Sequence, residues 1–172
     1  TFALLSRHPD VRRRLEAELA GHLGGRLPTS DDLPHLPFTE RVILEALRLY
    51  PPAWVFGRCA IGPDSIRGFP IPAGQVITIA PYVLHRHPEM WNNPEGFDPD
   101  RFAQERPKCA FVPFAAGPRQ CIGNYFSMLE ARLILATIAQ RVRLNLVPGA
   151  RLLPDPLVTL RPRYGVPVTP EF

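Results

Sequence analysis

The chain has 172 residues, 45% of them hydrophobic, which is enough for one domain of ordinary size with a single core. Its 20 basic and 16 acidic residues give a net charge of +4, and its 22 prolines and 12 glycines lie largely between short apolar runs, which argues against a simple helical bundle. Three cysteines, Cys59, Cys109 and Cys121, are odd in number and lack paired C-x-x-C spacing, which argues against a disulfide framework or a zinc site.

The start of the chain is an apolar run. The apolar run FALL follows Thr1 directly without a cap or turn signal, so we expect that the chain begins inside a helix. No window reaches the roughly 18 apolar residues of a membrane span, and the basic opening of a signal peptide is missing. We expect no membrane anchor within the chain, although one could lie upstream. Localisation stays open, with the cytoplasm expected if the source is bacterial.

Two helices are predicted before residue 53. The first begins near Pro9, places apolar side chains four residues apart and stops at the glycine pair that begins at Gly24. The second lies in TERVILEALRLYPP, with Thr39 as its candidate cap. It ends before the proline pair that begins at Pro51.

Strand-like segments and loops dominate the rest of the chain. Residues 55–79 are β-rich pieces broken by GPDS and PIPAGQ, as in a small hairpin, and residues 80–110 carry too many prolines to be other than mostly loop. After Cys121, SMLEARLILATIAQRVRL predicts a largely buried helix of about five turns. Residues 145–168 predict short strands separated by turns. The predicted fold class is α+β, mainly α with small β-sheets.

One loop, FVPFAAGPRQCIGNYF, carries a candidate binding site. Cys121 lies where a helix begins, and the amides at a helix start favour the thiolate over the thiol. Gly117 and Gly123 remove side chains on both flanks, which allows positive φ and close approach of the backbone to a flat ligand. The alternative is an inert buried cysteine, which is commoner for an isolated cysteine and is our interpretation of Cys59 and Cys109.

The neighbours of Cys121 suit a metal in a dry, anionic ligand. Backbone N–H groups would temper electron donation from the sulfur, and Phe111, Phe114 and Ile122 would keep water away from it. Arg119, two residues before the cysteine, can project toward an anion at the rim. These features together predict a planar, anionic, metal-bearing ligand.

The basic excess is concentrated in the last third of the chain. Between Gly117 and Gly165, only Glu130 and Asp155 oppose the arginines at positions 119, 132, 141, 143, 151, 161 and 163. This surplus indicates a bound anion or an acidic partner, and the alternative is a solvated helix face.

The loop FAAGPRQCIG matches F-x-x-G-x-R-x-C-x-G, and the chain here resembles the cytochrome P-450 family of haem-thiolate monooxygenases. Further signatures stand in the family's order. Glu45 and Arg48 give its E-x-x-R, and FDPDRF gives its meander, with Asp100 for the usual glutamate and Arg101 kept. The helix that contains Glu130 corresponds to the family's L-helix. The resemblance covers essentially the whole chain and less than half of a complete member.

The resemblance implies one C-terminal part of a single P-450 domain, residues 1–172, running from the end of the I-helix to the last β-hairpin. Its implied divisions are the J and K helices (1–52), a small β-sheet (53–80), the meander (81–113), the cysteine loop (114–123), the L-helix (124–143) and the C-terminal β-hairpins (144–172).

The resemblance also implies roles for individual residues. The cofactor would be haem b, with Cys121 as the axial ligand of its iron and Arg119 pairing with a haem propionate. Arg58 is similar to a second propionate-binding arginine, although it could be an exposed charge on a strand edge. Phe114, Gly117 and Gly123 are implied to complete the haem-binding loop.

Other polar residues are assigned away from the chemistry. Glu45 and Arg48 share a helix face, and in the family such a pair locks onto the meander arginine, here Arg101, as a scaffold for the cysteine loop. His85 and His87 alternate in LHRHPE, but two imidazoles without a third ligand make a poor metal site.

The activity implied is insertion of one atom of dioxygen into a lipophilic organic substrate, with electrons from an acidic partner, a ferredoxin or flavin reductase. Arg132, Arg141 and Arg143 are expected to help dock that partner. No nucleic acid is expected. Residues 53–57 and 155–158 are the expected substrate contacts. No catalytic residue is expected within the chain, because the proton-relaying acid-alcohol pair would lie upstream of Thr1.

Two other functions stay open. The first keeps the haem but changes the reaction to that of an isomerase or a peroxygenase. The sequence of the I-helix would distinguish these enzymes from a monooxygenase. The second is an inactive truncated fragment, which would leave a sheet edge and an apolar face uncovered.

Overall fold

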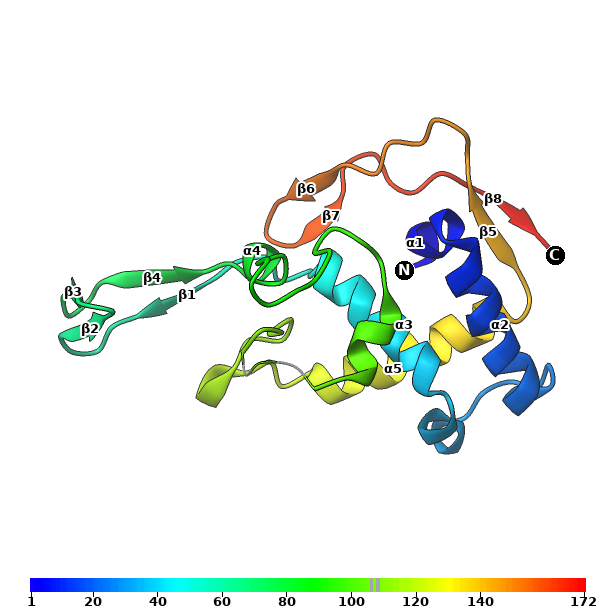
Figure 1. The fold of residues 1–172 in the computed structure, drawn as a ribbon, viewed down its shortest axis with the longest axis horizontal. Coiled ribbons are helices and arrows are strands. Elements are labelled where there is room, and N and C mark those ends of the chain that lie inside the picture. Colours follow the sequence, from blue (N-terminus) through cyan, green and yellow to red (C-terminus); the bar gives the residue numbers. More distant parts are fainter. Residues whose placement is uncertain (106, 108) are drawn as a thin grey trace.

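Helices form the body of the molecule, and pairs of short strands extend from it (Figure 1). The computed structural model describes residues 1–105, 107 and 109–172. The α-helices are α1 (Phe2–Arg7), α2 (Pro9–Leu23), α3 (Pro37–Leu49), α4 (Pro81–Leu84) and α5 (Asn124–Ala139). The 3-10 helices are η1 (Ser30–His35), η2 (Pro99–Ala103) and η3 (Gly117–Arg119). The predicted mixed α+β class is confirmed.

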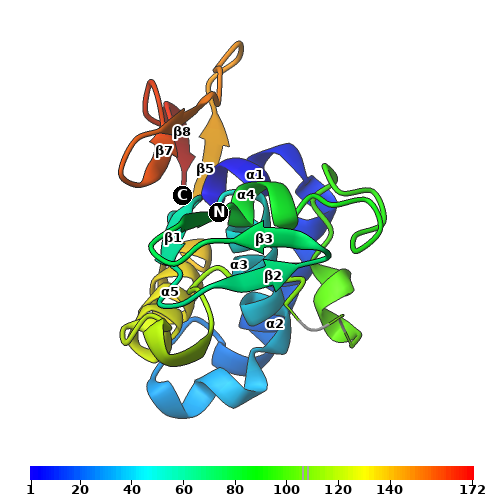
Figure 2. The same ribbon diagram turned by 90° about the vertical axis from the view of Figure 1, so that its left-hand side faces the viewer.

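The strands pair as four antiparallel two-stranded sheets within the described residues. They are β1 (Phe56–Cys59) with β4 (Val76–Ile79), β2 (Asp64–Ile66) with β3 (Phe69–Ile71), β5 (Arg143–Leu146) with β8 (Val168–Glu171), and β6 (Pro154–Pro156) with β7 (Leu160–Pro162). The first four form an arm that extends away from the helices (Figure 1), and β5, β7 and β8 stand beyond α1 (Figure 2). The strands predicted in 55–79 and in the tail are therefore present.

Helix α2 follows the sequence prediction closely. It begins at Pro9, and Gly24 ends it in the left-handed conformation with φ of 58°. That conformation favours glycine, because a Cβ would be strained there. The four apolar residues at every fourth position are all buried: Val11, Leu15, Leu19 and Leu23.

The predicted cap of α3 is wrong. The helix begins at Pro37, so Thr39 lies inside its first turn. The carboxylate of Glu18 on α2 accepts the N–H groups of Phe38 and Thr39, each at 2.7 Å, and the Thr39 hydroxyl at 2.8 Å. A side chain from another helix thus satisfies the free amides of this helix start, a contact that no local pattern reveals.

The core lies between α1, α2, α3 and α5. Leu15, Leu19, Leu36 and Val42 have no solvent exposure. Burying a side chain of this size contributes about 1.5–3 kcal/mol relative to leaving it in water. This packing fixes α3 and α5 next to each other, and both helices carry residues of the candidate site.

Helix α5 is shorter and more exposed than predicted. It ends at Ala139, and Arg143 already belongs to β5, so the expected range 124–143 is corrected at its C-terminal end. Only Leu135 and Ala136 are buried in it, whereas Tyr125 is 81% exposed. One face packs on the other helices, and the face near its start has no covering among the residues described.

The segment 81–113 contains more helix than expected from its prolines, namely α4 and η2. Both are short and begin at a proline, which fits the first turn of a helix because its N–H would be unpaired there. Residues 106 and 108 of this segment lie outside the described residues.

Candidate functional site

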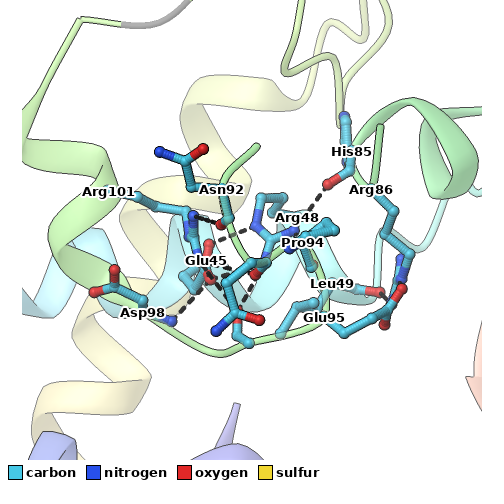
Figure 3. A network of polar contacts seen from close by, with 12 residues as sticks. Glu45, Arg48, Leu49, His85, Arg86, Asn92, Pro94, Glu95, Asp98 and Arg101 are labelled. Carbon is cyan, nitrogen blue, oxygen red and sulfur yellow. Dashed lines mark hydrogen bonds and ion pairs between the residues drawn. The ribbon is translucent and has the colours of Figure 1, made fainter. Parts of the chain in front are cut away.

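Glu45 and Arg48 form a buried ion pair on α3. Arg48 donates from Nε to one Glu45 oxygen at 2.7 Å and from Nη2 to the other at 2.8 Å, and neither side chain is exposed. Arg101 of η2 donates from Nε to Glu45 at 2.9 Å, and so does the N–H of Asp98 (Figure 3). The three residues expected to form the scaffold therefore meet at one carboxylate.

The remaining donors of the two arginines hold the segment between α4 and η2. Arg48 donates to the carbonyl oxygens of His85 at 2.8 Å, Pro94 at 2.6 Å and Gly96 at 2.9 Å (Figure 3). Arg101 donates to that of Asn92 at 2.8 Å. Charge-assisted hydrogen bonds to both oxygens of Glu45 and from all three guanidinium nitrogens of Arg48 offset the large cost of removing two charges from water.

Asp100, which replaces the family's usual glutamate, points away from this network. It accepts two bonds from Arg14 of α2, at 2.7 and 2.8 Å, and one from Arg41 of α3 at 3.3 Å. The hydrogen bond with Arg14 lowers the pKa of the Asp100 carboxyl below its ordinary value. Asp100 therefore ties η2 to two helices from the outer side.

The cysteine loop is a tight turn followed by η3. Its closing bond joins the Cys121 N–H to the Phe114 carbonyl oxygen at 2.9 Å. Gly117 has φ of 74°, as its predicted role requires, and Ala115 also has a positive φ of 60°. Left-handed backbone at a residue that carries a Cβ is uncommon and is held here by the surrounding bonds.

Gly123 does not have the predicted positive φ. Its φ is −81°, and it is the N-cap residue of α5. A Cβ added there would lie 3.7 Å from the Cys121 sulfur and 3.8 Å from Ser127 Oγ, which is ordinary contact. A Cβ would therefore fit at this position, and its contacts would be with Cys121 and Ser127.

A cavity of about 780 Å³ lies in front of the loop. Cys121, Arg119, Arg58 and Phe114 all line it, together with apolar residues of α3, α5 and the β6–β7 pair. Gly117 and Gly123 are not in its wall. Residues 63 positions apart thus come together, and Cys121 itself is exposed rather than buried.

Two of the three apolar residues expected to shield the sulfur lie elsewhere. Ile122 is fully exposed. Phe111 packs with the rings of Phe102 and His85, each 5.0 Å away between centroids. Of the three, only Phe114 lines the cavity.

Arg58 on β1 carries an unsatisfied donor at this cavity. Its Nη1 donates to the Gly57 carbonyl at 2.9 Å and its guanidinium lies over the Phe56 ring, 4.8 Å from the centroid. Its Nη2 is buried and has no hydrogen-bond partner among the residues described. A buried donor of this kind is costly unless a ligand accepts from it, so the site fits an anionic group.

The two expected substrate segments are joined to each other. Trp54 donates from its ring N–H to the Leu157 carbonyl at 2.8 Å, and the Leu160 N–H donates to the Pro52 carbonyl at 2.9 Å. Both bonds link chain segments about one hundred residues apart and escape any local pattern. They place the β6–β7 turn next to the end of α3.

The two histidines do not share one environment, and two of the three arginines expected to dock a partner are bonded within the chain. His85 is fully buried while His87 is exposed, and the described residues hold no group of three or more potential ligands that could bind a metal ion. Arg132 is only 15% exposed and bonds to the Leu33 carbonyl beside Glu40, and Arg143 pairs with Glu16 at 2.9 Å. Arg132 is thus largely removed from a docking surface, and Arg143, although exposed, is already paired with a carboxylate.

Comparison with known proteins identifies the family. The family model described as cytochrome P450 matches residues 1–166, and the chain belongs to that family. Its structure is a mixed α+β portion of the P450 fold. A zebrafish cytochrome P450 structure solved with abiraterone superposes with a TM-score of 0.85 at 33% identity, covering 99% of this chain and 43% of that one.

Two bacterial relatives are similar in sequence. Cyclooctat-9-en-7-ol 5-monooxygenase of Streptomyces melanosporofaciens is 45% identical over 155 residues, which are 88% of this chain and 34% of that protein. Pentalenene oxygenase of Streptomyces avermitilis is 41% identical over 163 residues, 92% of this chain and 36% of that protein. The chain thus spans about a third of the length of these relatives. Among the residues described, no helix has the length and apolarity to cross a membrane.

Proposed function

We propose that this chain is the C-terminal, haem-binding part of a haem-thiolate monooxygenase, with Cys121 as the axial ligand of a haem b iron. One observation carries the proposal. Cys121, Arg58 and Arg119 line one cavity of about 780 Å³ whose other lining residues are mainly apolar. A thiolate, two cations and apolar surfaces suit a flat ligand with a metal centre and carboxylates at its edge.

Such a cofactor supplies activation of dioxygen, with one atom inserted into the substrate and the other released as water. The residues of this chain would hold it. Cys121 would donate the thiolate, Arg58 and Arg119 would bind the propionates, and Phe114 would exclude water from the sulfur side. Glu45, Arg48 and Arg101 would keep the cysteine loop in place and take no part in proton transfer. The acid and alcohol that relay protons are expected outside these 172 residues.

A lipophilic substrate is favoured by the apolar wall that faces the cysteine. Phe56, Leu153 and Leu160 line the cavity on the side of the joined segments 53–57 and 155–158. Oxygen insertion is favoured over isomerisation because two relatives are named as a monooxygenase and an oxygenase. An acidic ferredoxin or flavin reductase stays the proposed electron donor. Of the three arginines proposed to dock it, Arg132 and Arg143 already have carboxylate partners, so Arg141 is the main candidate.

Activity is proposed for the protein expressed from its complete coding sequence rather than for residues 1–172 alone. Tyr125 and Phe126 at the start of α5 are 81% and 66% exposed. A large apolar surface next to a ligand cavity is typical of a face that another part of a protein covers.

Carbon monoxide binding tests the proposal. The reduced, haem-loaded protein should show the red-shifted Soret band of thiolate-ligated haem. Cys121→Ser should abolish that band, because a serine hydroxyl does not supply the thiolate. Cys59→Ser and Cys109→Ser are matched controls and should keep the band. A band that survives Cys121→Ser would overturn the assignment.

A further inference from the structure

His85 is a buried imidazole whose acceptor role is fixed by its neighbour. Its side chain has no solvent exposure, and its Nε2 lies 2.9 Å from the backbone nitrogen of Val112. A backbone N–H can only donate, so Nε2 is the acceptor and the ring is neutral with its proton on Nδ1. Nδ1 makes no well-formed hydrogen bond among the described residues, although weaker hydrogen bonding to the backbone of Arg48 and Leu47 partly offsets the lowering of the pKa of His85.

The backbone of His85 is attached to the buried ion pair of α3. Its carbonyl oxygen accepts from Arg48 Nη1 at 2.8 Å, and Arg48 is held by both oxygens of Glu45 (Figure 3). One residue thus contacts the scaffold through its carbonyl oxygen and the irregular segment before the cysteine loop through its ring.

The contact with Val112 leads on to Cys121 through backbone bonds. The Val112 carbonyl accepts the N–H of Ala115 at 3.1 Å, in the turn where Ala115 has its positive φ. The Phe114 carbonyl inside that turn accepts the N–H of Cys121 at 2.9 Å. Phe111, next to Val112 in the chain, also contacts His85: the centroids of the two rings are 5.0 Å apart.

We propose that His85 is a positioning residue for the haem ligand: by accepting the Val112 N–H it holds the 112–115 turn against the buried ion pair and so orients Cys121. The proposal rests on the haem-thiolate function proposed above. Charged groups lie around the imidazole of His85. Arg48 and Arg86 face it, Glu45 is already shared by Arg48 and Arg101, and the segment carrying Val112 contributes apolar groups.

Protonation would reverse the contact. A doubly protonated imidazole has two donors and no acceptor, so Nε2–H would face the Val112 N–H. Burial is the main cause that lowers the pKa of His85, with further lowering from Arg48 and Arg86, so the acceptor form persists at neutral pH. Acid should therefore release the turn.

Two variants separate the acceptor from the volume of the side chain. In the haem-loaded protein expressed from its complete coding sequence, His85→Gln keeps an oxygen that can accept from Val112 and does not titrate. His85→Phe fills the space with a ring but cannot accept. Far-ultraviolet circular dichroism and haem content establish that each variant is folded and loaded before comparison.

The readout is the reduced carbon monoxide spectrum, recorded from pH 7.5 down to below pH 4, because the pKa of His85 is lowered to about 4. At pH 7.5 the wild type and His85→Gln should show the thiolate band. In His85→Phe this band should fall about tenfold relative to the band of carbon monoxide-bound haem without the thiolate, as expected when a buried N–H loses its acceptor. On acidification His85→Gln should keep the band to a lower pH than the wild type. A His85→Phe protein with a wild-type band, or a His85→Gln protein with the wild-type pH profile, would overturn the proposal.

A second measurement does not depend on the haem. The hydrogen-exchange protection factor of the Val112 amide should fall with acidification in the wild type and stay constant in His85→Gln. If the wild type shows no thiolate band at all, the haem-thiolate function fails, while the Val112 amide still decides the role of His85. Constant protection in both proteins would refute that role.

Discussion

At the scale of single residues, burial decides which charges matter. Arg48 and Glu45 are fully buried, whereas the Arg14 and Asp100 side chains are about half exposed, at 50% and 47%. Both are arginine–carboxylate pairs with two short bonds. Removing one partner of a buried pair leaves the other charge uncompensated, but an exposed charge returns to water.

Arg48→Ala should therefore lower the free energy of unfolding by about 3–5 kcal/mol. Arg14→Ala, the control, should lower it by at most about 1 kcal/mol. Urea unfolding of the two variants and the wild type measures the difference. Equal effects of the two substitutions would contradict the assignment of Arg48 to the scaffold.

His85 should give the protein a distinctive pH dependence. Its pKa is lowered from 6.5 to about 4 in the folded state, chiefly by burial. The unfolded chain therefore binds the proton first as the pH falls, so stability is complete above pH 6.5 and is lost as the pH falls toward 4. The loss should be on the order of 3 kcal/mol, since one unit of pKa corresponds to about 1.4 kcal/mol.

The measurement is the urea midpoint at several pH values between 6.5 and 4. In His85→Gln the slope over this window should be much smaller, because glutamine does not titrate. An unchanged slope would mean that other groups cause the acid loss of stability.

The sequence predicts which residues belong to the site better than it predicts where their side chains point. FAAGPRQCIG predicts that Arg119 and Cys121 accompany one ligand, and both line the cavity. It does not reveal that Ile122 points to solvent, because the side-chain direction in a loop depends on φ and ψ of each residue. The contact of His85 with Val112 spans 27 residues and has no local signal at all.

At the scale of elements, the helix ends show the same division between local and distant causes. Gly24 ends α2 by its own conformational freedom, so the sequence predicts that boundary. The start of α3 depends on Glu18, which lies twenty positions before Phe38, whereas the local sequence pattern predicts Thr39 as the cap. Helix α5 ends early because Arg143 is already paired in β5 with Glu171 of the distant strand β8.

Glu18→Ala should test the cap of α3. It removes the acceptor of two amides and of the Thr39 hydroxyl, and should lower the free energy of unfolding by about 1–2 kcal/mol, as for other lost helix caps. Glu16→Ala is the control. Glu16 lies on α2, as Glu18 does, and is a surface partner of Arg143, so its loss should lower the free energy of unfolding by less.

Thermal unfolding of both variants provides the comparison. A Glu18→Ala protein as stable as Glu16→Ala would contradict the capping role.

At the scale of the whole molecule, the fold brings distant segments to one cavity. The end of α3, strand β1, the cysteine loop and the β6–β7 pair all contribute to its wall. The order of the motifs predicts that these segments belong to one family fold, and the match over residues 1–166 confirms the family. The shape of the cavity follows from packing of α3 on α5 and from the bond between Trp54 and Leu157, which no motif encodes.

The central claim is that the sulfur of Cys121 is bonded to a haem iron. X-ray absorption at the iron edge of the haem-loaded protein measures the atoms around the metal directly. We predict one sulfur among the iron ligands of the wild type and none in Cys121→Ser, with Cys59→Ser and Cys109→Ser unchanged. Iron surrounded by nitrogen and oxygen alone in the wild-type protein would contradict the account.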